Sequence, residues 1–174
     1  MSAGLEPSSD VDTAVHVAWI ALGSNLGQPA DHVGQAFEAL AAVSGLRLLG
    51  RSRLYRSTPV GGPPGQSDFC NAAAAVATTL SPFGLLTVLN AIEAGQGRVR
   101  IQRNGPRTLD LDIVAYDGMA FENERLTLPH PRAAERAFVL EPLADIAPAL
   151  SLGDAGRVAD LRAQVDATDL ALWY

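Results

Sequence analysis

Arg98-Val-Arg-Ile-Gln-Arg-Asn-Gly-Pro-Arg-Thr-Leu-Asp-Leu-Asp-Ile-Val-Ala-Tyr116 joins an arginine-rich loop directly to an alternating strand. Glycine and proline at positions 105 and 106 interrupt regular structure, so the four arginines of this stretch are expected on a loop. Successive side chains of a strand point to opposite faces, so Asp110 and Asp112 share one face. Leu109, Leu111 and Ile113 share the other. The pattern predicts one buried face and one face that carries carboxylates.

The two aspartates suit a metal-dependent reaction on phosphates. Residues two apart on a strand are separated by about 6.5–7 Å. Both carboxylates could therefore bind one Mg²⁺ or bridge a pair of ions. The arginines can bind phosphate oxygens bidentately and do not lose their charge. Together these groups predict phosphoryl transfer, which depends mostly on positioning and charge neutralisation. The alternative is an edge strand with a solvated outer face and unrelated surface arginines.

Composition narrows the classes of function. The chain has 174 residues, 48% of them hydrophobic, which predicts one soluble globular domain. We place it at residues 15–174, after a disordered tail at residues 1–14. A net charge of −6 argues against nucleic-acid binding. All 13 basic residues are arginine, which excludes the lysine of a P-loop or a protein kinase. Any ATP chemistry would depend on arginine and metal.

The sequence also indicates a compartment. The first residues lack the basic start of a signal peptide, and the apolar run at 15–22 is too short to span a bilayer. Cys70 is the single cysteine, so no intrachain disulfide or cysteine-rich zinc site can form. Its apolar surroundings predict a core residue. We expect a cytoplasmic monomer with neither nucleic-acid nor membrane partners.

The remaining pattern predicts the order of the elements. Hydrophobic periodicity and turn residues indicate strands at 15–22, 46–55, 69–79 and 110–116, with helices after Pro29 and after Ser81-Pro82. Asp117-Gly118 predicts a tight turn, with residues 119–121 returning as a hairpin partner. Short helices are expected within 138–148 and 158–165. This βαββαβ order predicts an α+β sandwich of ferredoxin-like type with an antiparallel sheet, an extra hairpin and C-terminal helices.

Four further features allow two interpretations each. The Gly/Pro-rich segment at 57–68 favours a functional loop over a passive connector. The segment at 23–27 favours a turn and helix cap over a phosphate loop. Asn71 lies in an apolar run and is either a satisfied structural amide or a ligand-binding group. His130, between two prolines and near two arginines, is either a surface histidine or a phosphate ligand.

Several motifs resemble one family. Gly-Arg-Val-Arg at 97–100 and Gly-Pro-Arg-Thr-Leu-Asp-Leu-Asp-Ile at 105–113 closely resemble the 6-hydroxymethyl-7,8-dihydropterin pyrophosphokinases of folate biosynthesis. So do Ala-Leu-Gly-Ser-Asn-Leu-Gly at 21–27, Phe-x-Asn at 69–71, Leu-x-x-Pro-His at 126–130 and Arg-x-Phe at 136–138. The resemblance implies transfer of the β,γ-pyrophosphoryl unit of ATP to the hydroxymethyl oxygen of the dihydropterin, with release of AMP.

The resemblance also implies roles for particular residues. Asp110 and Asp112 would hold two Mg²⁺ ions. The transferring phosphates would be clamped by Arg98 and Arg107, with Arg100 assisting. The triphosphate would be fixed by His130 and Arg136, and the nucleoside bordered by Glu93, Ile113, Arg125, Leu126 and Thr127. The pterin would lie between Phe69 and Phe138 and be recognised by Asn71 and the backbone of Ser57, Thr58 and Val60. The implied small-molecule partners are ATP and hydroxymethyl-dihydropterin.

Two positions depart from the family pattern, and two other functions compete. Asn104 stands where tryptophan is common, which bears on loop closure, and Pro131 stands where tyrosine can follow the histidine.

A polymerase-type nucleotidyl transferase would also place metal-binding aspartates on a ferredoxin-like sheet, but it predicts a basic nucleic-acid track. A non-catalytic ferredoxin-like ligand-binding module predicts no metal dependence and leaves the paired aspartates unexplained.

Overall fold

The computed structural model describes residues 14–59, 62–97 and 108–174. The first elements are β1 (His16–Ser24), α1 (Pro29–Ala42), β2 (Leu46–Arg51), β3 (Tyr55–Ser57), β4 (Phe69–Thr78), α2 (Pro82–Gly95) and β5 (Asp110–Tyr116). They are followed by β6 (Phe121–Glu122), β7 (Thr127–Leu128), α3 (Ala137–Ile146), α4 (Val158–Gln164) and β8 (Ala171–Leu172). Within these ranges, no helix is long and apolar enough to cross a membrane.

The main sheet confirms the predicted fold. Its strands lie in the order β5-β1-β4-β3-β8, and β2 also pairs with β4. All of these pairs are antiparallel. A central β1 flanked by β4 and β5, with two helices crossing over one face, is the arrangement expected of a ferredoxin-like α+β sandwich.

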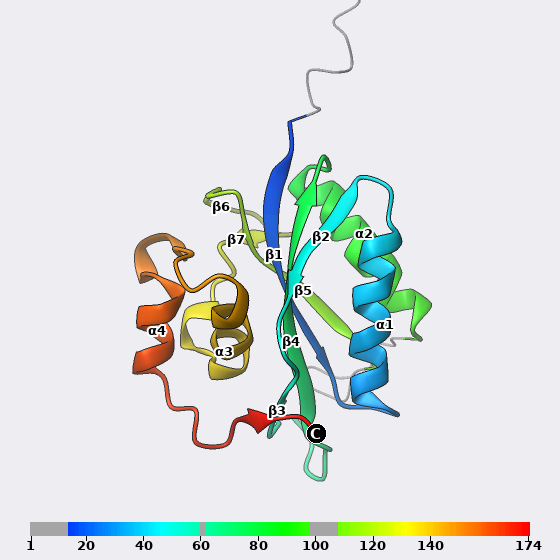
Figure 1. The fold of residues 1–174 in the computed structure, drawn as a ribbon, viewed down its shortest axis with the longest axis vertical. Helices are drawn as coiled ribbons and strands as arrows, with labels where there is room; N and C mark the ends of the chain where they lie inside the picture. Colours follow the sequence, from blue (N-terminus) through cyan, green and yellow to red (C-terminus); the bar gives the residue numbers. More distant parts are fainter. Residues whose placement is uncertain (1–13, 60–61, 98–107) are drawn as a thin grey trace, which may run out of the picture.

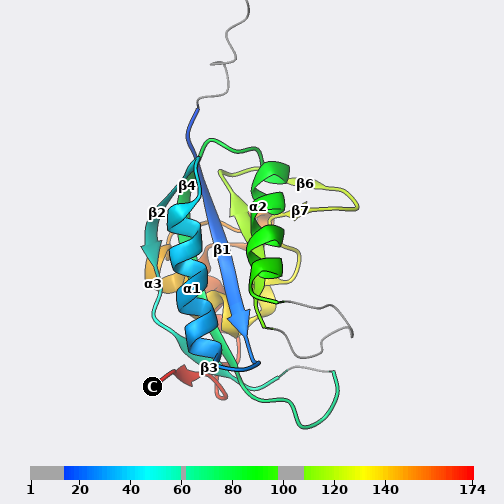
Figure 2. The same ribbon diagram turned by 90° about the vertical axis from the view of Figure 1, so that its right-hand side faces the viewer.

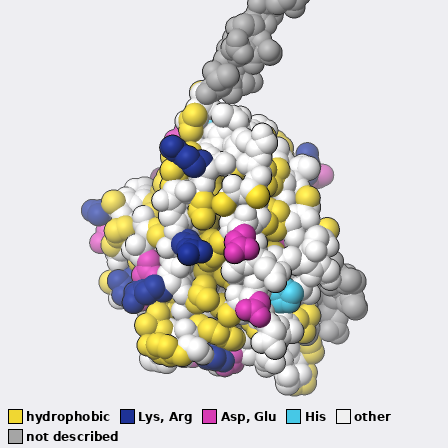
Figure 3. Space-filling model, turned by 45° about the vertical axis from the view of Figure 1, so that its right-hand side comes forward, with side chains coloured by type: hydrophobic (Ala, Val, Ile, Leu, Met, Phe, Trp, Pro, Cys, Tyr) yellow, Lys and Arg dark blue, Asp and Glu magenta, His cyan; other side chains and the backbone are white. Residues whose placement is uncertain are grey.

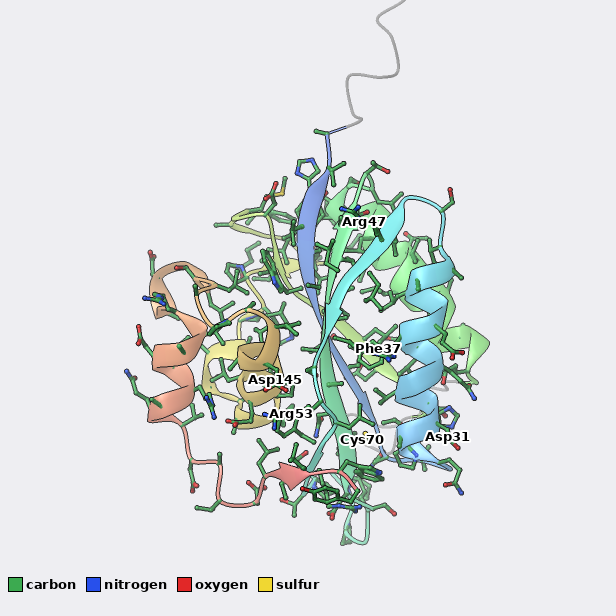
Figure 4. All side chains as sticks on the ribbon, viewed as in Figure 1. Asp31, Phe37, Arg47, Arg53, Cys70 and Asp145 are labelled. Carbon is green, nitrogen blue, oxygen red and sulfur yellow. The ribbon has the colours of Figure 1, made fainter. Side chains whose placement is uncertain are left out.

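Helices cover both faces of the sheet. Helices α1 and α2 lie side by side on one face, and α3 lies on the other with α4 beyond it (Figures 1 and 2). Phe37 points from α1 towards the sheet (Figure 4) and is 2% exposed. The Arg51 guanidinium lies 5.6 Å from its ring centroid. On this side of the molecule, hydrophobic side chains run between arginines and a group of acidic side chains and a histidine (Figure 3).

Strand β4 separates the two hydrophobic cores. Ala72, Ala74 and Val76 belong to the core under α1 and α2, whereas Ala73 belongs to the core under α3. Because both faces are buried, the strand shows a continuous apolar run instead of polar and apolar alternation. Its small side chains allow both helical layers to approach the sheet closely.

The predicted helix starts are confirmed. The Ser81 hydroxyl accepts a hydrogen bond from the Gly84 N–H at 3.1 Å, and Pro82 is the first residue of α2. Proline at the first helical position removes an N–H that would have no partner within the helix. Pro29 begins α1 in the same way.

The strand predicted at 46–55 is divided in two. β2 ends at Arg51 and β3 begins at Tyr55, and both pair with β4. Between them, the Ser52 hydroxyl accepts a hydrogen bond from the Ala73 N–H at 2.7 Å. A side-chain oxygen thus takes the place of a backbone acceptor, and it interrupts the ladder without leaving the buried N–H unpaired.

The predicted hairpin after β5 is wrong in its pairing. The turn itself forms, because Asp117 and Gly118 have positive φ angles of 46° and 74° and the Met119 N–H donates to Tyr116 O. However, β6 pairs with β7 and not with β5. The outer edge of β5 is instead contacted by the His130 N–H, which donates to Val114 O at 2.8 Å.

Candidate functional site

A cavity of about 510 Å³ lies between the sheet and the start of α3. Its floor comes from β5, β1, β4 and β3, and its other walls come from residues 130–139 and 166–170. This volume suits a small-molecule site. Because neighbouring strands are spaced by about 4.8 Å, the floor extends about 14 Å from β5 to β3. The cavity therefore has a β5 end and a β3 end.

Asp110 and Asp112 lie at the β5 end, and both line the cavity. Leu111 and Ile113 point the opposite way and are 2% exposed in the core under α1 and α2. The strand alternation therefore places the two carboxylates on the cavity face, as the sequence pattern predicted. The Leu111 N–H between them donates to Glu93 Oε1 at 2.9 Å. This bond ties the carboxylate-bearing part of β5 to α2.

The donor set at the β5 end suits a particular kind of metal. In the described part of the chain, no group of three or more His, Cys, Asp or Glu side chains could hold an ion by itself. Two carboxylates facing an open cavity instead match Mg²⁺, which binds through one or two carboxylates and completes its shell with water and substrate phosphates.

His130 lies in the same cavity with Arg132 and Arg136. Burial lowers the pKa of His130 below its ordinary value of 6.5; the positive charges of Arg136 and Arg132 lower it further, while Asp110 opposes them. The ring is therefore neutral at pH 7. Its Nδ1 accepts a hydrogen bond from the Arg132 N–H at 3.2 Å, so the ring proton is on Nε2. A neutral Nε2–H can donate to a phosphate oxygen.

The β3 end carries two aromatic rings and one amide side chain. Phe69 on β4 and Phe138 on α3 line the cavity from opposite sides, and Asn71 lies on its floor. Asn71 Nδ2 donates to the Ser57 hydroxyl at 2.7 Å, and the two residues are 4% and 3% exposed. This bond orients the amide so that Oδ1 is directed beside Gly23, which also lines the cavity.

Nine of the predicted site residues line this one cavity. They come from β3 and the residue after it, from β4 and β5, and from α3 and the segment before it: Ser57, Thr58, Phe69, Asn71, Asp110, Asp112, His130, Arg136 and Phe138. Such a gathering of residues that are distant in sequence supports a single site with two chemically different ends.

Five other predicted residues do not line the cavity. Glu93 and Ile113 are buried behind the sheet. The others belong to the β6–β7 hairpin, where the Arg125 guanidinium lies 5.0 Å from the ring centroid of Phe83; these residues are Arg125, Leu126 and Thr127. Their expected place beside the nucleoside stays a prediction. Arg98, Arg100, Arg107 and Val60, together with the departure at Asn104, lie outside the described residues.

Several residues of the cavity wall were not predicted from the sequence. Arg132, Glu135, Asp166, Asp169 and Leu170 all line it. Arg132 could have been found from its position two residues after His130. The last three carry no local signal, because they reach the cavity through the pairing of β8 with β3.

Comparisons with known proteins identify relatives of the chain. The family described as 7,8-dihydro-6-hydroxymethylpterin-pyrophosphokinase (HPPK) matches residues 19–148. A 2-amino-4-hydroxy-6-hydroxymethyldihydropteridine pyrophosphokinase of Methylorubrum extorquens is 52% identical over 136 residues, which cover 78% of this chain and 85% of the relative. The enzyme of the same name from Haemophilus influenzae is 45% identical over 144 residues, which cover 83% of this chain and 89% of the relative.

Solved structures share the fold. The Plasmodium falciparum HPPK-DHPS triple mutant with STZ-DHP matches with a TM-score of 0.68 at 14% sequence identity. The match covers 87% of this chain and 43% of that chain, so this chain corresponds to less than half of that protein.

Proposed function

Since this chain belongs to the 7,8-dihydro-6-hydroxymethylpterin-pyrophosphokinase family, we propose that its reaction takes place in the cavity between the sheet and α3. The reaction transfers pyrophosphate from ATP to the hydroxymethyl group of 6-hydroxymethyl-7,8-dihydropterin. The hydroxymethyl oxygen bonds to the β-phosphorus, the bond from that phosphorus to the α-phosphate oxygen breaks, and AMP leaves. The enzyme is an ATP-dependent diphosphokinase of folate biosynthesis.

The β5 end of the cavity is the phosphate end in this proposal. Asp110 and Asp112 would hold Mg²⁺, two ions in the full complex, since they offer hard oxygen ligands facing an open cavity. When bound, the metal neutralises phosphate charge and aligns the reacting oxygens. His130 would donate from neutral Nε2, and Arg136 would supply a permanent positive charge. Arg98, Arg100 and Arg107 remain predicted phosphate ligands.

The β3 end would bind the pterin. A flat heterocycle fits between two aromatic rings, and Phe69 and Phe138 line the cavity from the sheet and the helix. The Asn71 Oδ1 would accept a hydrogen bond from an N–H of the ring, because Nδ2 already donates to Ser57. Ser57 and Thr58 would border the pterin edge, with Val60 expected nearby. The observation that carries the proposal is that one cavity joins this recognition group to Asp110 and Asp112.

The test is a coupled assay for AMP release from ATP and Mg²⁺, with and without 6-hydroxymethyl-7,8-dihydropterin. Wild type should release AMP only when the pterin is present, and Asp110→Ala should abolish release while keeping the wild-type melting temperature. Wild-type protein that binds ATP or pterin without Mg²⁺ and makes no AMP would refute the proposal.

A further inference from the structure

The wall of the cavity at its β3 end is built by a segment far from the other site residues. We name residues 165–173 the C-terminal strap. It leaves α4 and crosses to β3, where β8 joins the edge of the sheet (Figure 1). Its Asp166, Asp169 and Leu170 line the cavity. The match to the family ends at residue 148, so this wall lies outside the matched range.

Hydrogen bonds and a cation–π contact order the strap and hold its end on the sheet. Near its start, Asp166 Oδ1 accepts a hydrogen bond from the Thr168 N–H at 3.0 Å, which forms a tight local turn. Near its end, the Trp173 N–H donates to Leu54 O at 2.9 Å, and the Arg56 guanidinium lies 3.9 Å from the Trp173 ring centroid. A local turn thus precedes Asp169, and the part of the strap that follows it is anchored to the sheet.

Asp169 contacts the residue that directly follows β3. The Thr58 hydroxyl donates to Asp169 Oδ2 at 2.6 Å, a length typical of a hydrogen bond to a carboxylate. Thr58 follows Ser57, whose hydroxyl accepts the bond from Asn71. A continuous path thus runs from the strap, through Thr58 and Ser57, to the amide at the cavity floor.

The distribution of charge places this contact away from the phosphate end. Asp169 lies beside the end of β3, whereas His130 contacts β5 and Asp110 and Asp112 belong to β5. A carboxylate beside the phosphates would repel them. At the far end it can act on the pterin side alone.

We propose that Asp169 is a positioning residue for the pterin: through the Thr58 hydroxyl it fixes the backbone of Ser57 and Thr58 against the ring edge. This inference rests on the proposed placement of the pterin at the β3 end. Thr58 and Asp169 are both exposed. An exposed hydrogen bond contributes little to global stability, so the contact can be removed without unfolding the protein.

The test compares Asp169→Ala, Asp169→Asn, Thr58→Val and the double variant Asp169→Ala/Thr58→Val with wild type. Asp154→Ala, an exposed aspartate outside the cavity, is the matched control. The KM for hydroxymethyl-dihydropterin, the KM for ATP, kcat and the melting temperature are measured for each. Pterin affinity is also measured directly by equilibrium dialysis.

Asp169→Ala and Thr58→Val should each raise the pterin KM and dissociation constant by about fivefold, the effect of one lost hydrogen bond. The KM for ATP and the melting temperature should stay at wild-type values. Asp169→Asn retains an oxygen acceptor and should restore most of the affinity. The double variant should be no worse than either single variant, since both remove the same contact.

An unchanged pterin KM in Asp169→Ala would overturn the inference, as would equal rises in the KM for ATP and pterin. A lowered melting temperature that accounts for the lost affinity would also overturn it. These outcomes presuppose wild-type AMP release that depends on pterin. Its absence would instead defeat the proposed function, so the two failures can be told apart.

Discussion

The Asn71 amide on β4 donates a hydrogen bond to the Ser57 hydroxyl on the neighbouring strand β3, with Nδ2 and Oγ 2.7 Å apart. Both side chains are almost entirely buried. The bond fixes which end of the amide points to the cavity. An acceptor oxygen, and not a second donor, is thereby offered to a ligand at the β3 end.

Replacing this amide should weaken pterin recognition selectively. Asn71→Ala removes a hydrogen bond at a buried site, worth about 1.5 kcal/mol or about tenfold in the pterin KM. The KM for ATP should change by less than about twofold, because the proposed phosphate end is the β5 end of the cavity. Steady-state kinetics with each substrate varied would check this. Asn90→Ala, an exposed amide on α2, is the control, and equal weakening of both substrates would contradict the prediction.

Glu93, on α2, should hold β5 in the position that directs Asp110 and Asp112 into the cavity. Its carboxylate accepts the N–H of Leu111, between the two cavity aspartates. Glu93→Ala leaves that buried N–H without this acceptor, so unfolding free energy should fall by about 1–3 kcal/mol and kcat should fall with it. Glu93→Gln keeps an acceptor oxygen and should lose less than half as much. Urea unfolding and kcat measurements would show whether Glu93→Ala loses more stability and activity than Glu93→Gln. Equal losses in the two variants would argue against this role.

The ionisation of His130 should be observable directly. Burial and the charges of Arg136 and Arg132 lower its pKa below 6.5. In an NMR titration, the ring of His130 should therefore change protonation at a pH below 6.5. Because the folded pKa is depressed, the unfolded chain binds this proton more readily, and stability should decline as pH falls below about 6.5.

Removing one of the two positive charges near His130 should reduce the lowering of its pKa. In Arg136→Gln, the pKa of His130 should rise towards its ordinary value, because a nearby positive charge no longer opposes protonation. Glu124→Gln, an exposed charge change in the β6–β7 turn, should leave the titration unchanged. A wild-type midpoint at or above 6.5 would count against the proposed neutral donor.

Asp145 joins α3 to the sheet and should contribute stability that depends on pH. Its carboxylate accepts hydrogen bonds from the Arg53 side chain at 3.0 and 3.2 Å and from the Tyr55 hydroxyl at 2.9 Å. Figure 4 shows Arg53 and Asp145 together between the sheet and α3. Burial would raise the pKa of Asp145, but the bonds from Arg53 and Tyr55 outweigh it, and the pKa is lowered below 3.8.

A carboxyl group whose pKa is lowered by folding stabilises the folded state at pH values above its pKa in the unfolded chain. That contribution is lost as the pH falls through its pKa in the folded protein. Asp145→Asn should therefore reduce unfolding free energy by about 1 kcal/mol at pH 7, a value limited by solvent exposure. The difference from wild type should shrink below pH 3.8. Thermal melts at pH 7 and pH 3 would check this, with Asp160→Asn as an exposed control; a difference that grows at low pH would contradict it.

The sequence predicted most of the fold and the paired aspartates because those features depend on local patterns, whereas the residues of the β3 end followed from the family resemblance. Alternation alone places Asp110 and Asp112 on one face, and Ser81-Pro82 marks a helix start. The errors arise from long-range pairing. The hairpin after β5 fails because His130 contacts the strand edge, and the break at Ser52 depends on the Ala73 N–H. The sequence of the strap contains no local pattern that predicts its position, because β8 has only two residues and forms through its pairing with β3.

The hydrogen bond between Thr58 and Asp169 joins residues 111 positions apart. During synthesis, a nascent chain that has emerged only as far as α3 already contains β1 to β5 with Asp110 and Asp112, yet it lacks one wall of the cavity at the β3 end. The strap must leave the ribosome and join β3 before that end of the cavity is complete. Competence to bind the pterin should therefore appear as an abrupt step once Trp173 has emerged and can reach Leu54.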